Sequence, residues 1–454
     1  MSIATINPTT GATDRMFEAH SDAEVDKRLS AAAGAFDAFR RSSFVDRARW
    51  MVAAAELLEG ELPDIAQVLT TEMGKTFAAA KGEVAKSART MRYFAQHAAG
   101  MLADESVPEA GLSARVAYRP LGPVLAVMPW NFPLWQVVRF AAPALMAGNV
   151  GLLKHASNVP QTALLIEDVF RRAGFPEGVF QTLLVDASRV SRLVSDQRVK
   201  AVTLTGSDLA GASVASEAGR SLKKSVLELG GSDPFLVMPS ADLQRAVATG
   251  VEARIQNNGQ SCIAAKRFII HDDVYEQFEQ AMVEAMERLT VGDPMEPATE
   301  LGPLATEQGR STVQAQVDDA RAKGARVLCG GEPIGGAGFF YPPTVLAGLD
   351  ARMRVFGEEV FGPVAMLYRV GDAGEALALA NSSVFGLGAS IWTEDPVEQA
   401  LFQEELEAGM VFTNAPVASM PELPFGGVKR SGYGRELGLH GLREFCAVKT
   451  LWSA

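Results

Sequence analysis

The chain has 454 residues, enough for about three domains of ordinary size, and 48% of them are hydrophobic, so a large buried core is possible. Its 42 basic and 54 acidic residues give a formal net charge of −12, which argues against nucleic acid or an anionic membrane as a partner. The longest apolar stretch, residues 140–153, is too short and too interrupted by proline, glycine and asparagine to span a bilayer.

Three cysteines, Cys262, Cys329 and Cys446, are too widely spaced for a disulfide framework and favour a reducing cytoplasm. The five histidines are scattered, and neither an HExxH motif nor a CxxC pair occurs, so we expect no metal site. The first eight residues carry neither the basic segment nor the apolar core of a secretory signal. We therefore expect a cytoplasmic protein that needs no metal.

The first quarter of the chain is predicted to be helical. Residues 21–104 are rich in alanine, and Ser21 followed by Glu24 has the pattern of a capping box at a helix start. Residues 112–119 alternate loosely in polarity and end in a proline-glycine turn, so they are predicted to form a strand.

From residue 124 onward, short apolar strands alternate with helical patterns. Strands are predicted at 124–128, 151–154, 201–205, 235–238 and 267–270. Helices are predicted at 161–173, 211–218, 243–257 and 274–289. This alternation is typical of parallel α/β sheets, and Gly230-Gly231 divides it into two halves. The glycine-rich stretches 292–302 and 330–338 are predicted to be loops.

Cys262 is the first candidate for chemistry, because it directly follows the polar turn Gly259-Gln260-Ser261. A cysteine before an apolar run is often a small buried side chain without any reactivity. A glycine turn can instead leave backbone N–H groups free, and a nearby helix N-terminus would lower the pKa of the thiol. Both interpretations stay open on these residues alone.

Glu228 is the second candidate, flanked by Leu227 and Leu229 and followed by two glycines. A glutamate at the end of a strand is usually solvated. Partial burial between leucines would raise the pKa of its carboxyl group, so that it could act as a base near neutral pH. Taken alone, this signal is weak.

Other motifs allow both a plain and a functional interpretation. The segment 129–133 (PWNFP) is a proline-framed turn, unless Asn131 donates its amide to a developing oxyanion. The segment 205–211 (TGSDLAG) is a strand-to-helix turn, unless a pyrophosphate rests at the helix N-terminus; it lacks the lysine of a Walker loop. Taken singly, both motifs favour the plain interpretation.

In series, the motifs resemble the aldehyde dehydrogenase superfamily over nearly the whole chain. In order they are PWNFP, LK, TGS, LELGG, GQSC, EEVFGPV and PFGGVKRSGYGRE. The resemblance implies an α/β fold with two parallel-sheet domains and a small β arm for a homodimer or homotetramer. The implied ranges are 1–101 and 121–230 for the cofactor-binding domain, 231–430 for the catalytic domain, and 102–120 and 440–454 for the oligomerisation arm.

The resemblance also implies a covalent mechanism. Cys262 matches the nucleophile, Glu228 the base that activates water, and Asn131 the oxyanion donor, which acts with the backbone N–H of Cys262. The thiolate adds to an aldehyde, a hydride passes to the nicotinamide, and water releases the acid from the resulting thioester.

Seven positions match cofactor contacts of the family, with NAD or NADP as the cofactor. They are Trp130, Lys154, Ser157, Gly206, Ser207, Glu359 and Phe361. NAD-preferring members often carry a glutamate where this chain has Ser157. A glutamate would repel the 2′-phosphate of NADP, whereas a serine can donate to it, so we expect NADP to be favoured.

Arg139 indicates the substrate, because members similar to succinate-semialdehyde dehydrogenases carry arginine at this position of the substrate tunnel. A guanidinium can bind a carboxylate through two hydrogen bonds. Ser419 matches a serine near that carboxylate, and the aromatic residues expected to line the tunnel are Phe132, Trp135 and Phe425. We expect succinic semialdehyde, with glutarate semialdehyde or a neutral aldehyde as alternatives. That Arg139 instead pairs with a structural acid is less expected.

Rival functions are disfavoured by single residues. Ala264 stands where some enzymes of this activity have a second cysteine, so a disulfide switch beside Cys262 is not expected. Transfer of the thioester to coenzyme A is opposed by the presence of Glu228. A cysteine hydrolase would require a histidine beside the thiol, and His271 is merely the nearest in sequence. The intact set of Cys262, Glu228 and Asn131 opposes a non-enzymatic scaffold.

Overall fold

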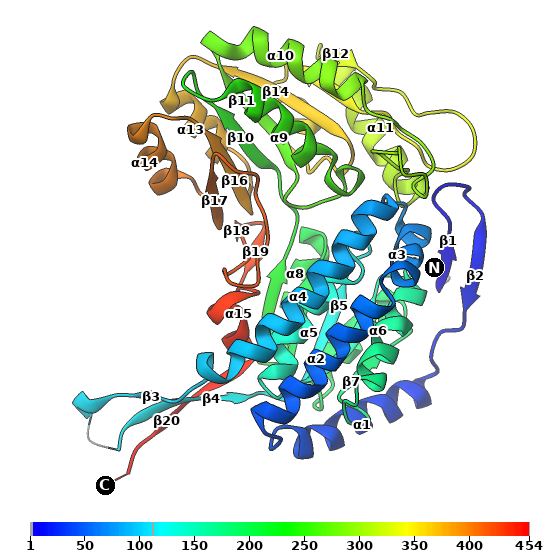
Figure 1. Ribbon diagram of the computed structural model, residues 1–454, viewed down its shortest axis with the longest axis vertical. Coiled ribbons are helices and arrows are strands. Elements are labelled where there is room, and N and C mark those ends of the chain that lie inside the picture. The colour runs from blue at the N-terminus through cyan, green and yellow to red at the C-terminus, as the bar shows by residue number, and fades with distance from the viewer. Residues whose placement is uncertain (1–2, 111–112, 454) are drawn as a thin grey trace.

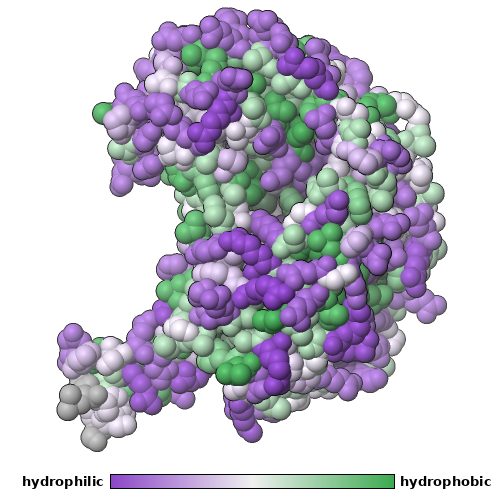
Figure 2. Space-filling view, viewed as in Figure 1, coloured by the Kyte–Doolittle hydropathy of each residue, from purple (hydrophilic) through white to green (hydrophobic). Residues whose placement is uncertain are grey.

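The computed structural model describes residues 3–110 and 113–453. Two α/β bodies, each built on its own mainly parallel sheet, lie one above the other, and a thin β arm extends from the lower body (Figure 1). The predicted α/β class with two parallel sheets is therefore confirmed. The face in Figure 2 is largely hydrophilic, and its outline is hollowed between the two bodies.

The first body contains a six-stranded sheet in the order β19-β9-β8-β5-β6-β7, parallel except for β19. Its strands are β5 (Pro123–Met128), β6 (Val150–His155), β7 (Phe180–Thr182), β8 (Ala201–Thr205), β9 (Lys224–Glu228) and β19 (Gly432–Tyr433). Because β5, β8 and β9 are neighbours and parallel, the loops that follow them meet at one edge of the sheet. The candidate segments 129–133 and 205–211 begin at that edge.

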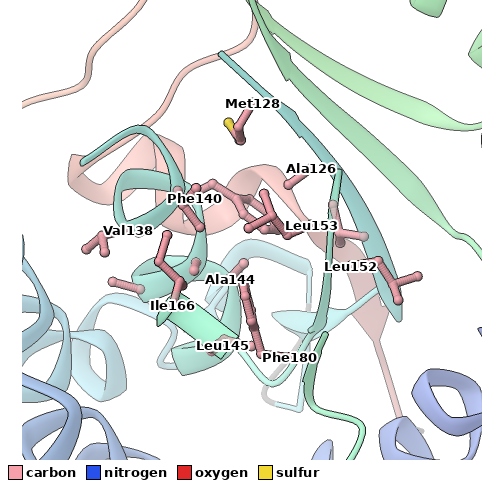
Figure 3. Close-up of a cluster of buried hydrophobic side chains, with 14 of the residues drawn as sticks. Ala126, Met128, Val138, Phe140, Ala144, Leu145, Leu152, Leu153, Ile166 and Phe180 are labelled. Atoms are coloured by element: carbon pink, nitrogen blue, oxygen red, sulfur yellow. The ribbon is translucent and has the colours of Figure 1, made fainter. Parts of the chain in front are cut away.

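Helices cover this sheet on both faces. They are α1 (Asp22–Phe39), α2 (Phe44–Gly60), α3 (Leu62–Met73), α4 (Phe77–Met101), α5 (Trp135–Met146), α6 (Pro160–Arg172), α7 (Val190–Ser195) and α8 (Asp208–Arg220). Ser21 caps α1 by accepting the N–H of Glu24, as its sequence predicts. Apolar side chains from β5, β6, β7, α5 and α6 interlock in the core, among them Met128, Phe140 and Phe180 (Figure 3). The core packing holds α5 against the sheet.

The second body contains a seven-stranded sheet in the order β12-β13-β14-β11-β10-β16-β17, parallel except for the β12–β13 pair. Its strands are β10 (Asp233–Val237), β11 (Ala265–His271), β12 (Arg326–Cys329), β13 (Thr344–Ala347), β14 (Val364–Val370), β16 (Gly388–Trp392) and β17 (Met410–Thr413). Its helices are α9 (Leu243–Ile255), α10 (Asp272–Glu287), α11 (Glu307–Ala322), α12 (Arg354–Gly357), α13 (Ala373–Asn381) and α14 (Pro396–Glu405).

The arm is a three-stranded antiparallel sheet in the order β20-β4-β3, which reaches away from the first body (Figure 1). Its strands are β3 (Glu105–Ser106), β4 (Arg115–Pro120) and β20 (Cys446–Leu451), and α15 (Gly438–Glu444) precedes β20. The strand predicted at 112–119 begins at Arg115 and ends at Pro120, and residues 111–112 lie outside the described residues.

The remaining elements are short, and four of them form two separate two-stranded antiparallel sheets. They are β1 (Ile3–Ile6), β2 (Thr13–Phe17), β15 (Phe385–Gly386), β18 (Val428–Lys429) and the short 3₁₀ helices η1 (Pro108–Ala110), η2 (Ala187–Arg189) and η3 (Gln256–Gly259). Among the described residues, no helix is both long and apolar enough to cross a membrane.

Candidate active site

The loop that carries Cys262 is shaped by three consecutive left-handed residues, Asn257 (φ 57°), Asn258 (φ 58°) and Gly259 (φ 75°). They end the predicted helix 243–257 at Ile255, because left-handed backbone cannot continue an α-helix. A Cβ on Gly259 would lie 2.4 Å from the carbonyl carbon of Gly362, so only glycine fits there.

Side chains tie this loop to its surroundings. The Asn258 amide donates to the backbone oxygens of Gly74 at 2.8 Å and Pro303 at 2.9 Å. The Asn257 amide donates to the backbone oxygen of Asn131 at 2.7 Å, which joins the loop to the segment that follows β5. The loop is therefore fixed to both bodies.

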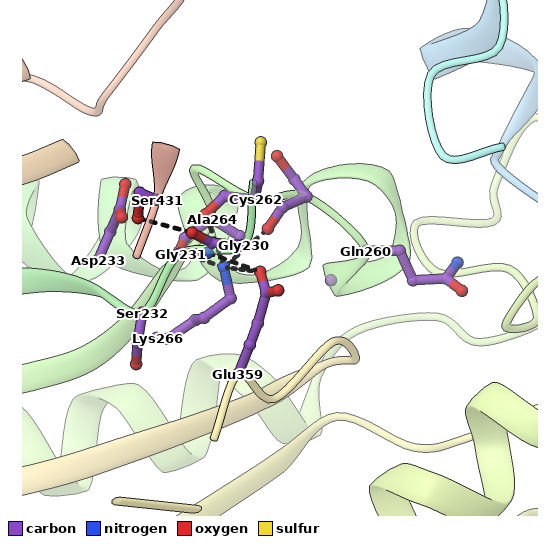
Figure 4. Close-up of polar contacts among 12 residues, drawn as sticks. Gly230, Gly231, Ser232, Asp233, Gln260, Cys262, Ala264, Lys266, Glu359 and Ser431 are labelled. Atoms are coloured by element: carbon purple, nitrogen blue, oxygen red, sulfur yellow. Dashed lines mark hydrogen bonds and ion pairs between the residues drawn. The ribbon is translucent and has the colours of Figure 1, made fainter. Parts of the chain in front are cut away.

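Lys266 supports the loop from beneath and is completely buried. Its ammonium donates to the backbone oxygens of Ser261 and Cys262, each at 2.8 Å, and lies 3.2 Å from Glu359. The Cys262 side chain points away from Lys266 and Glu359 (Figure 4). A Cβ on Gly231 would lie 2.6 Å from the backbone oxygen of Cys262. This close approach explains why the second of the two glycines in the segment after Glu228 has no side chain.

Of the two interpretations left open for Cys262, the structure does not support a pKa lowered by a helix N-terminus. Cys262 lies in a turn before β11 rather than at the N-terminus of an α-helix. Burial raises the pKa of its thiol to about 12, and the positive charges of Arg139 and Lys266 only partly oppose this. The thiol is therefore protonated at neutral pH in the protein by itself.

Two cavities meet at Cys262. One has a volume of about 250 Å³ and lies at the carboxyl ends of β5, β8 and β9. The other has a volume of about 260 Å³ and is bordered by α4, α5 and the segment around Ser419. Cys262 and Gln136 line both cavities, so a reagent in either one can reach the sulfur.

The first cavity is lined by most of the residues expected to contact a cofactor. These are Trp130, Gly206, Ser207, Glu359 and Phe361. Ser207 caps α8 by accepting the N–H of Ala210 at 3.3 Å, and the Trp130 and Phe361 rings meet edge to face with centroids 5.7 Å apart. A Cβ on Gly230 would lie 2.5 Å from a carboxyl oxygen of Glu359, so glycine keeps this wall open. A helix N-terminus beside aromatic rings fits a dinucleotide.

Lys154 and Ser157 are not among the residues that line these two cavities. Lys154 is near the end of β6, the neighbour of β5, and burial lowers the pKa of its ammonium. Ser157 is in the turn that follows β6, where its backbone oxygen accepts the N–H of Ala4 at 3.0 Å. They lie on the far side of β5 from β8.

Asn131 lines the first cavity together with Cys262 and is buried. One N–H of its amide donates to the backbone oxygen of Gln260 at 3.2 Å. An amide nitrogen carries two hydrogens, so the second one remains for an oxygen in the cavity. This geometry suits an oxyanion donor.

The second cavity brings together every residue expected to contact the substrate. These are Phe132, Trp135, Arg139, Ser419 and Phe425. Glu83 of α4 fixes the start of α5 by accepting the N–H groups of Leu134 and Trp135, both at 2.9 Å. Aromatic walls with polar groups at one end fit a short aldehyde that has a polar end.

Arg139 has a carboxylate partner of its own, the outcome that was less expected from the sequence. It forms a buried ion pair with Glu436, and its Nη2 lies 3.3 Å from the Thr205 hydroxyl. Its guanidinium also stacks 4.3 Å from the centre of the Phe425 ring. It borders the cavity, but its charge is matched by Glu436.

Glu228 lines neither cavity. It is 2% exposed, and burial raises the pKa of its carboxyl group well above the usual value, partly opposed by Arg139. A Cβ on Gly426 would lie 2.7 Å from its Oε1, so the carboxyl group lies against Gly426. The desolvation predicted from the flanking leucines is thus present, but the structure does not bring the carboxyl group to the cavities that Cys262 lines.

Four residues at the site were missed from the sequence: Lys86, Gln136, Lys266 and Glu436. Gln136 follows Trp135 and lies one turn before Arg139 on α5, a spacing that could have indicated it. Lys266 and Lys86 gave no signal, because lysines are mostly exposed. The residues at 3–110 and 113–453 contain no cluster of histidine, cysteine or acidic side chains that could hold a metal.

A thiol between a nucleotide-type cavity at parallel strand ends and a cavity for a small polar molecule suits an oxidoreductase. The chain belongs to the aldehyde dehydrogenase family, whose sequence model matches residues 1–451. The predicted family is thereby confirmed.

Several succinate-semialdehyde dehydrogenases are similar to this chain over nearly its full length. The succinate-semialdehyde dehydrogenase (NADP+) 1 of Mycobacterium ulcerans strain Agy99 is 58% identical over 456 residues, covering 100% of both chains. The crystal structure of succinic semialdehyde dehydrogenase from Streptococcus pyogenes in complex with NADP+ has a TM-score of 0.96 and 36% identity, covering 99% of each chain. The succinate-semialdehyde dehydrogenase from Burkholderia pseudomallei has a TM-score of 0.96 and 35% identity, covering 99% of this chain and 94% of that one.

Proposed function

We propose that this protein oxidises succinic semialdehyde to succinate and uses NADP+ in preference to NAD+. The observation that carries the proposal is the position of Cys262, where a cavity with dinucleotide features meets one with cationic and aromatic walls. The full-length identity of 58% to a protein named for this reaction supports the choice of substrate. A short aldehyde with a carboxylate at its far end matches the second cavity.

In the first half of the reaction, the sulfur of Cys262 bonds to the aldehyde carbon. The free N–H of Asn131 and the backbone N–H of Cys262 stabilise the negative oxygen that forms, a contribution of roughly 10²–10³ in rate for one donor. Lys266 keeps the loop in position through the carbonyl oxygens of Ser261 and Cys262. The thiol proton passes to solvent water as the thiolate forms, and the positive charge of Arg139 favours the thiolate.

In the second half, water releases the acid from the Cys262 thioester. Glu228 takes a proton from that water, and its raised pKa suits a base that works near neutral pH. For this step its carboxyl group must turn from Gly426 toward Cys262.

Seven residues would hold the cofactor, which accepts the hydride when bound: Trp130, Lys154, Ser157, Gly206, Ser207, Glu359 and Phe361. The capped start of α8 suits a pyrophosphate, and Glu359 suits the hydroxyl groups of a ribose. Ser157 is uncharged and can donate to a 2′-phosphate, which supports NADP+.

This assignment of residues also gives each body a function. We infer a cofactor-binding domain at 1–101 and 121–230, a catalytic domain at 231–430, and an oligomerisation arm at 102–120 and 440–454. The three free cysteines fit a cytoplasmic location. The projecting arm fits a homodimer or homotetramer.

The test is oxidation of succinic semialdehyde followed by nicotinamide absorbance, with NADP+ and NAD+ compared at equal concentration. We expect a higher kcat/KM with NADP+, no turnover above background for Cys262→Ala, and a single burst of reduced cofactor for Glu228→Gln. Glutarate semialdehyde and butanal complete the panel. Equal or faster oxidation of either one, or full activity of Cys262→Ala, would refute the proposal.

A further inference from the structure

Lys86 places a second cationic group in the cavity where the substrate is expected. It lies on α4, is half-buried, and lines the same cavity as Cys262. Its Nζ is 2.6 Å from the Ser419 hydroxyl and 4.3 Å from the centre of the Trp135 ring. The ammonium therefore stands between a hydroxyl group and an aromatic face inside the cavity.

The other charged groups of this cavity are already matched. Glu83 pairs with Lys75 through one carboxyl oxygen and accepts two backbone N–H groups with the other. Arg139 pairs with Glu436. Lys86 has no carboxylate within ion-pair distance in the part of the chain that the structure describes. The charge left over in the cavity is thus one positive charge, at Lys86.

We propose that Lys86, together with the Ser419 hydroxyl, binds the far carboxylate of the substrate and makes the enzyme prefer aldehydes with an anionic end. The inference rests on the proposed function and deepens it by identifying the group that selects this substrate class. An ammonium and a hydroxyl side by side can both donate to one carboxylate. A buried carboxylate requires such a partner, and the charge of Arg139 is occupied by Glu436.

The selection by Lys86 depends on pH. Burial lowers the pKa of its ammonium to about 8, assisted by Arg139 of α5 and Arg89 of α4 and opposed by Glu83 of α4 and by Cys262 of the loop before β11. A base with a lowered pKa carries its positive charge below that pH and loses it above. Preference for the anionic aldehyde is therefore full well below pH 8, about half of that at pH 8, and about tenfold lower at pH 9.

The experiment compares succinic semialdehyde with butanal, a neutral aldehyde of the same chain length. Lys86→Met should lower kcat/KM for succinic semialdehyde by about 10- to 100-fold and change that for butanal less than twofold. Lys81→Met is the matched control. Lys81 is exposed on the same helix, and this substitution removes the same charge as Lys86→Met. Lys81→Met should leave kcat/KM unchanged for both substrates.

Two further measurements separate binding from folding and from turnover. Calorimetric binding of succinate should weaken by a similar factor in Lys86→Met and stay unchanged in Lys81→Met. In the wild type, the ratio of kcat/KM for the two substrates should fall above pH 8, whereas Lys86→Arg should keep the ratio high at that pH.

Equal losses for both aldehydes in Lys86→Met, or a ratio independent of pH, would overturn the inference. The proposed function would still stand in that case if the wild type favoured succinic semialdehyde. A wild type that oxidises butanal as well as succinic semialdehyde would overturn both ideas.

Discussion

At the scale of single residues, the ion pair between Arg139 and Glu436 gives this arginine a structural role in addition to its place in the cavity wall. Both side chains are buried, with relative exposures of 2% and 3%, and Glu228 lies in the same electrostatic environment. A buried acid without a cation is strongly disfavoured. Arg139 therefore holds the acids of this region in place, whatever it contributes to the substrate.

The first prediction concerns the loss of that charge. Arg139→Leu should lower the free energy of unfolding by about 3–5 kcal/mol, because Glu436 is left buried and unpaired. Urea unfolding measures the change. Arg139→Leu/Glu436→Leu should recover most of the loss, since two apolar side chains can replace a buried pair. A single variant as stable as the wild type would show that the ion pair does not carry this role.

Lys86 shows why the binding residues could be predicted only in part. The sequence motifs predicted Cys262, Asn131 and Arg139, because each stands at a fixed place in a recognisable segment. Nothing in the pattern of α4 marks Lys86, because the polar positions of an amphipathic helix indicate solvent. Its role follows only from the packing of α4 against α5 and from its contact with Ser419, 333 positions away in sequence.

At the scale of elements, the turn between α9 and β11 determines where the sulfur lies. The sequence predicted a helix through residue 257, and the left-handed backbone of Asn257 and Asn258 shortens it. Asparagine tolerates this conformation but does not require it, so the pattern gave no warning. The same turn bears on the Cys262 pKa, because the interpretation with a lowered pKa required a helix N-terminus beside the thiol.

The prediction at this scale compares two glycines. Gly259→Ala should lower kcat by about 100-fold, because a Cβ would overlap the backbone of Gly362 and displace the loop that carries Cys262. Gly324→Ala is the control, since Gly324 also has a positive φ, of 103°, but nothing lies within 4 Å of an added Cβ. It should cost about 1 kcal/mol of stability and leave kcat unchanged.

Thermal unfolding followed by circular dichroism measures the stability of both variants, and steady-state kinetics measures their kcat. If Gly259→Ala keeps the wild-type kcat, the tight approach to Gly362 is not what positions the sulfur. If both variants lose activity equally, backbone strain rather than the overlap is responsible.

At the scale of the whole molecule, the site joins segments that are far apart in the chain. Cys262 comes from the second body and Asn131 from the first. The stretch 419–436 also reaches the site, where Ser419 and Phe425 line the second cavity and Glu436 pairs with Arg139. Alternating strands and helices predicted the two parallel sheets, because each unit is local. The return of β19 to the first sheet was not predicted, since a two-residue strand leaves no periodic pattern.

The arm presents an unpaired edge. In the order β20-β4-β3, β20 is an edge strand, and Val448 on it is 70% exposed while Trp452, just beyond it, is 61% exposed. Exposed apolar residues on a free strand edge favour pairing with another chain. The arm extends away from its own body (Figure 1), so a second copy can reach this edge.

The last prediction is therefore that the protein is a homodimer or homotetramer and that Val448→Glu shifts it toward a particle of 48.3 kDa. A buried glutamate at the interface would lack a partner, which opposes association. Ala447→Glu is the control, because its side chain lies on the opposite face of the same strand and adds the same charge. Light scattering with size-exclusion chromatography measures the mass. A monomeric wild type, or an unchanged mass for Val448→Glu, would mean that β20 does not join the subunits, and equal shifts in both variants would place the contact on both faces of the strand.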